Sequence, residues 1–88
     1  MDSLDEIVLE TLANICNVER SALAPDTTLT DIGFDSLGAS AFASEMDASH
    51  GVPIEPEDLG RLYMALTPAE VITLMKELRA RNAVAAGG

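Results

Sequence analysis

The sequence has few of the residues that form disulfides, metal clusters or nucleic-acid contacts. Cys16 is its only cysteine, so an internal disulfide and a thiolate metal cluster are both excluded, and we expect a reducing, cytoplasmic environment. Only five Lys and Arg stand against fifteen Asp and Glu, which gives a formal net charge of -10. Phosphate backbones and anionic membranes both attract cations. The charge balance therefore argues against nucleic-acid and membrane partners.

Long apolar runs are also missing. No stretch approaches the ~20 residues that a membrane helix needs, and the N-terminus lacks the basic and apolar regions of a secretory signal. The 88 residues, 48% of them hydrophobic, suit one compact domain. We expect this domain to span residues 1–81, with a flexible tail over residues 82–88. We expect a monomer whose negative charge favours encounters with basic patches on other proteins.

Apolar residues at helical spacing predict a first helix from about Ser3 to Cys16. Ser3 and Glu6 have the pattern of a capping box at its start, and Cys16 is expected as a small buried side chain at its end. The inward stripe comprises Leu4, Ile7, Val8, Leu12 and Ile15.

The helical period is lost over residues 17–35, where proline, glycine, aspartate and threonine predict a long ordered loop. Such a loop in a small domain needs apolar side chains to hold it against the core. The candidates are Leu23, Leu29, Ile32 and Phe34.

A second helix is predicted from Asp35 or Ser36 to His50, because Gly51 then supplies a residue that readily takes positive φ. Its inner stripe comprises Ala39, Phe42, Ala43 and Met46, with His50 partly covering the core at the end. We expect Met46, Met64 and Met75 to fill the core.

A short irregular or helical piece is predicted between Pro53 and Tyr63. The run Thr67-Pro68-Ala69-Glu70 then combines an N-cap, a proline at the first helical position and a capping-box glutamate. The last buried stripe comprises Val71, Leu74, Met75 and Leu78. The absence of any alternating strand pattern favours an all-α fold, a small four-helix bundle with a long loop between helices one and two and a short third helix.

The run Gly33-Phe34-Asp35-Ser36-Leu37 places a hydroxyl in the first turn of the second predicted helix. Free backbone amides and the helix dipole favour an anionic group such as a phosphate at this point. Asp and Ser are also ordinary N-cap residues, so a purely structural role is the alternative. His50 lies about fourteen residues along the same helix, roughly 20 Å away, so a Ser-His hydrolase is poorly supported.

Together with Leu29 and Ile32 before it, this run resembles the attachment motif of the acyl carrier protein family. The core positions that follow match as well: Phe42, Met46, Gly51, Val52 and Ile54. The resemblance implies that a phosphopantetheinyl transferase attaches 4'-phosphopantetheine from coenzyme A to Ser36. It also implies that the thiol of this arm holds acyl groups as thioesters. Acyltransferases, ketosynthases or other partner enzymes would then perform the chemistry, while the carrier catalyses nothing.

Two departures from that family point to a specialised pathway. The outer face of the second helix keeps only Glu45 and Asp47 as acids, where fatty-acid carriers have several. The stretch over residues 55–66 is about one turn longer than usual. Both departures favour polyketide or related natural-product synthesis. A fatty-acid carrier and an acidic helical adaptor that never carries a substrate remain the alternatives.

The expected partner-recognition surface surrounds Ser36 and continues onto the third helical piece. For the charged residues of that piece, a merely solvated face is the alternative. The residues proposed for recognition are Asp35, Leu37, Glu45, Asp47, Glu57, Asp58 and Arg61.

Overall fold

The computed structural model describes the backbone of residues 3–87 and the side chains of residues 4–81. Within this part the chain forms helices and turns and no strand, so the prediction of an all-α four-helix bundle is confirmed. The α-helices are α1 (Ser3–Cys16), α2 (Ser36–His50), α3 (Pro56–Met64) and α4 (Pro68–Gly87). Two 3-10 turns, η1 (Arg20–Ala22) and η2 (Leu29–Ile32), lie in the loop between α1 and α2.

Residues with special backbone geometry end the first two helices. Asn17 takes the left-handed conformation, with φ of 58°, and the Val18 N–H donates to the Ala13 carbonyl at 3.0 Å. Gly51 does the same after α2, with φ of 67°, and its N–H donates to the Met46 carbonyl. Both residue types tolerate positive φ, which explains why the chain turns at these points.

The last helix begins as its sequence pattern predicts. The Thr67 hydroxyl accepts from the Glu70 N–H at 3.4 Å, and the Glu70 carboxylate accepts from the Leu66 N–H at 3.2 Å. Pro68 occupies the first helical position, where its missing N–H costs nothing. The capping box predicted for Ser3 and Glu6 involves the Ser3 side chain, which lies outside the described residues.

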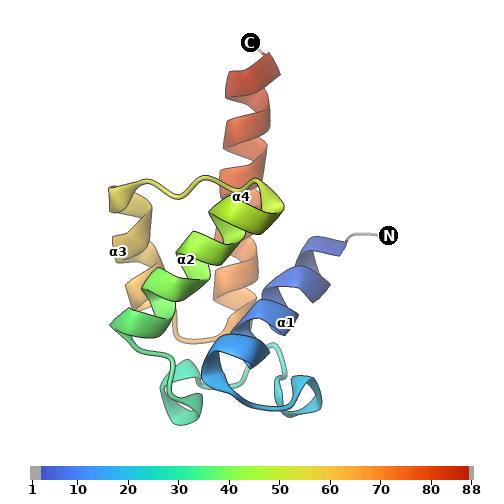
Figure 1. The fold of residues 1–88 in the computed structure, drawn as a ribbon, viewed down its shortest axis with the longest axis vertical. Helices are drawn as coiled ribbons and strands as arrows, with labels where there is room; N and C mark the ends of the chain where they lie inside the picture. Colours follow the sequence, from blue (N-terminus) through green and yellow to red (C-terminus); the bar gives the residue numbers. More distant parts are fainter. Residues whose placement is uncertain (1–2, 88) are drawn as a thin grey trace.

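The helices form a bundle in which α4 stands upright behind α2, with α1 on one side of it and α3 on the other (Figure 1). α1 packs against both α4 and α2, and α2 packs against α3. The loop between α1 and α2 closes the end of the bundle opposite the C-terminus (Figure 1). It is tied to the α3–α4 connection, because the Leu29 N–H donates to the Leu66 carbonyl at 2.9 Å.

One hydrophobic core joins all four helices and the loop. The predicted loop contacts are confirmed, since Leu23, Leu29 and Phe34 are buried and Ile32 packs against the core. The helical stripes supply the rest of the buried apolar side chains: Leu4, Val8, Leu9, Leu12 and Ala13 from α1; Ala39, Phe42 and Met46 from α2; Leu62 from α3; and Val71, Leu74, Met75 and Leu78 from α4, with Val52 between α2 and α3.

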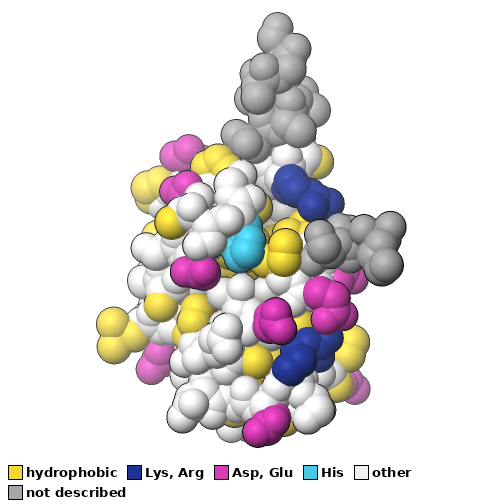
Figure 2. All heavy atoms as spheres, turned by 45° about the vertical axis from the view of Figure 1, so that its right-hand side comes forward, with side chains coloured by type: hydrophobic (Ala, Val, Ile, Leu, Met, Phe, Trp, Pro, Cys, Tyr) yellow, Lys and Arg dark blue, Asp and Glu magenta, His cyan; other side chains and the backbone are white. Residues whose placement is uncertain are grey.

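The structure corrects two predictions about the core. Met64 is 79% exposed rather than buried, because it ends α3 and Leu62 takes the inward position. His50 is exposed at the end of α2, and the histidine lies at the surface in Figure 2. Met46 and Met75 are buried as predicted, and Cys16 is half-buried.

α4 continues past the predicted domain boundary at residue 81 and reaches Gly87. The predicted flexibility of residues 82–88 stays a prediction, because the side chains of residues 82–87 and the whole of residue 88 lie outside the described part. Among the described helices, none combines the length and apolar character that crossing a bilayer requires.

Candidate functional site

The loop that leads into α2 is fixed by one glycine and one aromatic contact. Gly33 has φ of 87°, a conformation that favours glycine, and its N–H bonds to η2 carbonyls. The Phe34 N–H donates to the Leu29 carbonyl at 3.0 Å. The Phe34 ring is buried and meets Phe42 edge to face, with the ring centroids 6.4 Å apart and an interplanar angle of 84°. The chain therefore enters α2 from a defined direction.

Asp35 caps α2. Its side-chain Oδ1 accepts from the Gly38 N–H at 2.9 Å, and its carbonyl accepts from the Ala39 N–H at 2.8 Å. Amides in the first turn of a helix have no helical carbonyl four residues earlier to bond to. The amides of Ser36 and Leu37 are in this position, so they are free to bind an anion at the positive end of the helix dipole.

Ser36 stands at this point with its side chain exposed, next to Leu37, whose side chain is 80% exposed. Among the described residues, no histidine or carboxylate bonds to the Ser36 hydroxyl; Asp35 uses its Oδ1 on the cap. His50 lies at the opposite end of α2. The arrangement therefore offers an accessible hydroxyl beside free amides rather than a nucleophile activated by a base.

The start of α2 lies close to the end of α1 at Gly38, with room for a Cβ in ordinary van der Waals contact. A Cβ at this position would lie 3.5 Å from the Ile15 Cγ2 and 3.5 Å from the Phe34 Cδ1. The same approach brings Cys16 near Asp35. Burial raises the pKa of the Cys16 thiol above its usual value, and the Asp35 charge adds to this effect. The thiol is therefore a weak nucleophile, in agreement with a packing role for Cys16.

Ion pairs engage cationic side chains away from the start of α2. Arg20 pairs with Glu6 at 3.2 Å, and Lys76 pairs with Asp5 at 3.1 Å. On the face shown in Figure 2, Lys and Arg side chains lie beside Asp and Glu side chains. α2 itself contributes acids and no Lys or Arg. α2 therefore carries a net negative charge, which favours approach by a basic partner.

Most residues predicted for partner recognition are accessible. Asp35, Leu37, Glu45, Asp47 and Glu57 are exposed. Arg61 is exposed too, but its guanidinium bonds to the Glu77 carboxylate at 2.6 Å. Hydrogen bonding to Arg61 holds the pKa of Glu77 below its usual range.

The structure contradicts the prediction that Asp58 belongs to the recognition surface. Asp58 is 1% exposed, and its Oδ2 accepts from the Arg81 Nη2 at 2.7 Å and from the Glu55 N–H at 3.1 Å. The hydrogen bond from Arg81 holds the pKa of Asp58 below its usual value, against the opposing effect of burial. Asp58 is therefore a buried structural carboxylate that no partner can reach.

Sequence reasoning missed three exposed apolar side chains at the end of α3 and just after it. Tyr63, Met64 and Leu66 are 49%, 79% and 61% exposed. The Tyr63 hydroxyl lies 3.4 Å from the hydroxyl of Ser40, which is one turn beyond Ser36, so Tyr63 lies beside the first half of α2. The uninterrupted apolar run over residues 62–66 was the available signal, because one face of a short helix cannot bury all of it.

Comparison with known protein families identifies the family to which the chain belongs. Residues 6–79 match the family described as phosphopantetheine attachment site. Because the match covers most of the chain, the protein belongs to this family of acyl carrier domains. Neither the curated proteins nor the solved structures give a significant match.

Membership of this family makes the domain a site of covalent 4'-phosphopantetheine attachment. The residues present fit such a group. An exposed serine hydroxyl accepts a phosphodiester without rearrangement of the core, and the free amides at the start of α2 suit the phosphate charge. When bound, the arm supplies a thiol that carries a partner enzyme's substrate as a thioester.

Proposed function

We propose that Ser36 is the attachment point and that this domain carries acyl intermediates as thioesters between partner enzymes. The observation that supports this most directly is the position of Ser36, an exposed hydroxyl at the capped, amide-rich start of α2. In the transfer reaction, the Ser36 oxygen bonds to the phosphorus that carries pantetheine. The pyrophosphate bond of coenzyme A breaks, the adenosine bisphosphate leaves, and the hydroxyl proton passes to the transferase or to water.

The fold supports a carrier without catalytic groups of its own. Asp35 is committed to the cap, and Phe34 anchors the loop by contact with Phe42. These contacts fix the base of the arm while leaving it in solvent. Partner enzymes then supply the acids, bases and nucleophiles for the acyl chemistry.

We propose a polyketide or related natural-product pathway, with a fatty-acid pathway as the alternative. The exposed face of α2 carries small residues such as Ser40, Ala41 and Ala48 among its acids. Exposed apolar residues at the end of α3 extend this face. Such a surface supports docking with a smaller electrostatic contribution than a densely acidic helix would give.

Intact-mass measurement tests the attachment. The chain is incubated with coenzyme A, magnesium and a broad-specificity phosphopantetheinyl transferase. We expect the gain of one phosphopantetheine group in the wild type and in Ser40→Ala, and no gain in Ser36→Ala. Ser40 is the matched control, because it is an exposed serine one turn further along α2. No gain in the wild type, or a gain that survives Ser36→Ala, would refute the proposal.

The two alternative functions, an acidic adaptor and a hydrolase, predict different experimental results. An acidic adaptor keeps full biological activity in Ser36→Ala, whereas a carrier loses it. A hydrolase turns over ester substrates as the purified chain alone. Mass spectrometry of the protein from its native cell, with the thioester intact, identifies the cargo and so distinguishes the two pathways.

A further inference from the structure

A groove of about 450 Å³ lies between the end of α3 and the first turns of α4. Its apolar lining comes from Met64 and Ala65 on one side and from Ala69 and Leu74 on the other. Leu74 is buried, so it lies at the base of the groove, whereas Met64 is 79% exposed. Leu66, in the connection between the two helices, is also exposed. Exposed apolar surface of this kind typically marks an interaction site.

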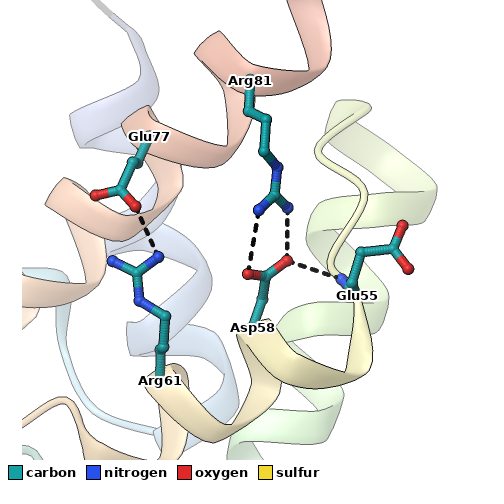
Figure 3. A network of polar contacts seen from close by, with 5 residues as sticks. All are labelled: Glu55, Asp58, Arg61, Glu77 and Arg81. Carbon is teal, nitrogen blue, oxygen red and sulfur yellow. Dashed lines mark hydrogen bonds and ion pairs between the residues drawn. The ribbon is translucent and has the colours of Figure 1, made fainter. Parts of the chain in front are cut away.

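The groove is bounded at both ends. Residues 65–67 join the two helices at one end. At the other end the Arg61 guanidinium bonds to the Glu77 carboxylate at 2.6 Å, and the buried Asp58 pair bridges the helices beyond it (Figure 3). Along α4, Ala69 and Glu77 are eight residues apart, which is roughly 12 Å at 1.5 Å per residue. The groove therefore has the length of about two helical turns.

The backbone amides that border the groove are already bonded within the chain. The N–H groups of Ala65, Leu66, Ala69, Glu70 and Val71 donate to Leu62, Glu70, Pro25, Thr67 and Thr67 in turn. An extended peptide gains affinity by pairing with free backbone groups, whereas a helix satisfies its own backbone. The groove therefore suits the apolar face of a helix, with side chains at positions i, i+4 and i+7 entering it.

The charged groups that border the groove are negative on balance. The exposed Glu77 carboxylate pairs with Arg61, so these two charges offset one another. The Glu70 carboxylate bonds to the Leu66 N–H and the Thr67 hydroxyl, which are neutral donors, so its negative charge is kept. The whole chain has a formal net charge of -10, which repels a second copy. A partner with Lys and Arg beside its apolar face is therefore favoured.

α3 separates this groove from the side that faces α2. Leu59 lines the groove between α2 and α3, and the Tyr63 hydroxyl lies beside a hydroxyl of α2. Arg61 and Met64 instead line the groove toward α4. Residues three or four apart share a face of a helix, so these two pairs of side chains belong to different faces of α3. A helix seated between α3 and α4 therefore does not lie over the start of α2.

We propose that the groove between α3 and α4 is a docking site for a short amphipathic, basic helix of a partner protein. Its apolar side chains enter the groove beside Met64 and Leu74, and its Lys or Arg side chains face Glu70 and Glu77. The start of α2 stays accessible, so this partner and an enzyme acting on Ser36 bind at the same time. The docking site does not depend on Ser36 carrying the arm.

Selection from a displayed peptide library, with the full chain as bait, tests the site. The library holds helical peptides of about sixteen residues, with leucine at positions i, i+4 and i+7 and random residues elsewhere. We expect the enriched peptides to be rich in Lys and Arg. In nuclear magnetic resonance of the labelled chain, they should shift amide signals of residues 61–74 more than those of residues 36–48. No enrichment, enrichment of acidic peptides, or shifts centred on α2 would each contradict the proposal.

Matched variants locate the binding energy. Met64→Ala should weaken binding of the enriched peptide about tenfold, and Leu37→Ala by less than about twofold, although these two side chains are 79% and 80% exposed. Ala69→Arg fills the groove and should weaken binding about tenfold or more, whereas Ala48→Arg adds the same charge to the exposed face of α2 and should have little effect. Fluorescence anisotropy of a labelled peptide measures all four. If Ala69→Arg does not fold, the comparison of Met64→Ala with Leu37→Ala gives the decision.

Equal effects within either matched pair would overturn the proposal. Shifts of residues 61–74 that grow with the concentration of the chain alone would show that a second copy occupies the groove instead. The bound peptide should not slow loading of Ser36 by the transferase, and a peptide that blocks loading would refute simultaneous binding. Ser36→Ala should bind the peptide as the wild type does. Failure of the transferase to load Ser36 would therefore leave the binding measurements unaffected.

Discussion

Replacement of Asp35 tests whether the start of α2 is held by its cap. Asp35→Ala removes the acceptor of the 2.9 Å bond from the Gly38 N–H, which costs about 1 kcal/mol in typical helices. It also removes a negative charge at the positive end of the helix dipole, worth roughly 0.3–1 kcal/mol at low salt. Asp35→Asn keeps an oxygen for the cap and loses only the charge.

We therefore expect Asp35→Ala to lower the free energy of unfolding by roughly 1 to 2 kcal/mol and Asp35→Asn by less than about 1 kcal/mol. In a domain of this size each kcal/mol corresponds to about 4–8 °C in melting temperature. Thermal melts and urea titrations followed by circular dichroism measure both. The Asp35→Asn deficit should shrink in high salt, whereas most of the Asp35→Ala deficit should remain.

Equal stability of Asp35→Ala and the wild type would show that the cap does not hold α2. An Asp35→Asn variant as unstable as Asp35→Ala would show that charge, and not hydrogen bonding, is the main contribution. Loading of Ser36 by the transferase gives a separate readout. If Asp35→Asn folds normally but loads more slowly, the Asp35 charge also takes part in partner recognition.

Three further predictions concern the fold. Gly33→Ala should destabilise the protein by about 1–2 kcal/mol, because φ at this position is 87°, even though no atom lies within 4 Å of the added Cβ. Gly38→Ala should stabilise the protein by up to about 1 kcal/mol, because the new contacts of 3.5 Å are ordinary and Ala favours a helix; thermal melts that give the reverse order would contradict both expectations. Added salt should raise the melting temperature, since acids outnumber bases by fifteen to five and screening of their repulsion outweighs the loss of exposed ion pairs; a falling melting temperature would refute this. The pKa of Asp58 is lowered in the folded protein, so the stabilising contribution of its carboxylate is complete above the ordinary carboxylate pKa and is lost as the pH falls through the lowered value. Urea titrations at several pH values should show this acid-induced loss of stability in the wild type and a weaker loss in Asp58→Asn. Equal pH dependence of stability in the two proteins would count against this role of Asp58.

The helices that depend on local signals were predictable from the sequence. The observed bounds of α1 and α2 agree with those expected, and α4 begins at Pro68 as its capping pattern indicates. Each signal consists of residues within about one turn of one another, such as Thr67 with Glu70. Local hydrogen bonding and apolar periodicity determine such elements without knowledge of the fold.

Asp58 was mispredicted because its environment is not local. Its partner Arg81 is 23 residues away on another helix, and nothing in the residues next to Asp58 indicates burial. A charged side chain in a short, polar segment is exposed in most proteins. Only the packing of α3 against α4 reveals that this carboxylate lies inside.

Met64 was mispredicted for a different reason. The run over residues 62–66 is apolar throughout, so it contains no periodicity that separates inward from outward positions. In α3 the Leu62 side chain faces the core, and the helix ends at Met64, so the side chains of Met64 and Leu66 stay exposed. The position of the helix end decides which of these side chains is buried, and just beyond that end the Leu66 carbonyl accepts from the Leu29 N–H in the distant loop.

The contrast between α2 and α3 suits a protein that presents one group to many enzymes. Every contact at the start of α2 is short-range and redundant: the Gly33 turn, the Phe34–Phe42 ring contact and the Asp35 cap each fix the position of Ser36. α3 buries Leu62 and Asp58, and Leu59 packs partly against the core. Because fewer side chains of α3 are buried than of any other helix, we expect motion to concentrate in α3 while the start of α2 stays in place.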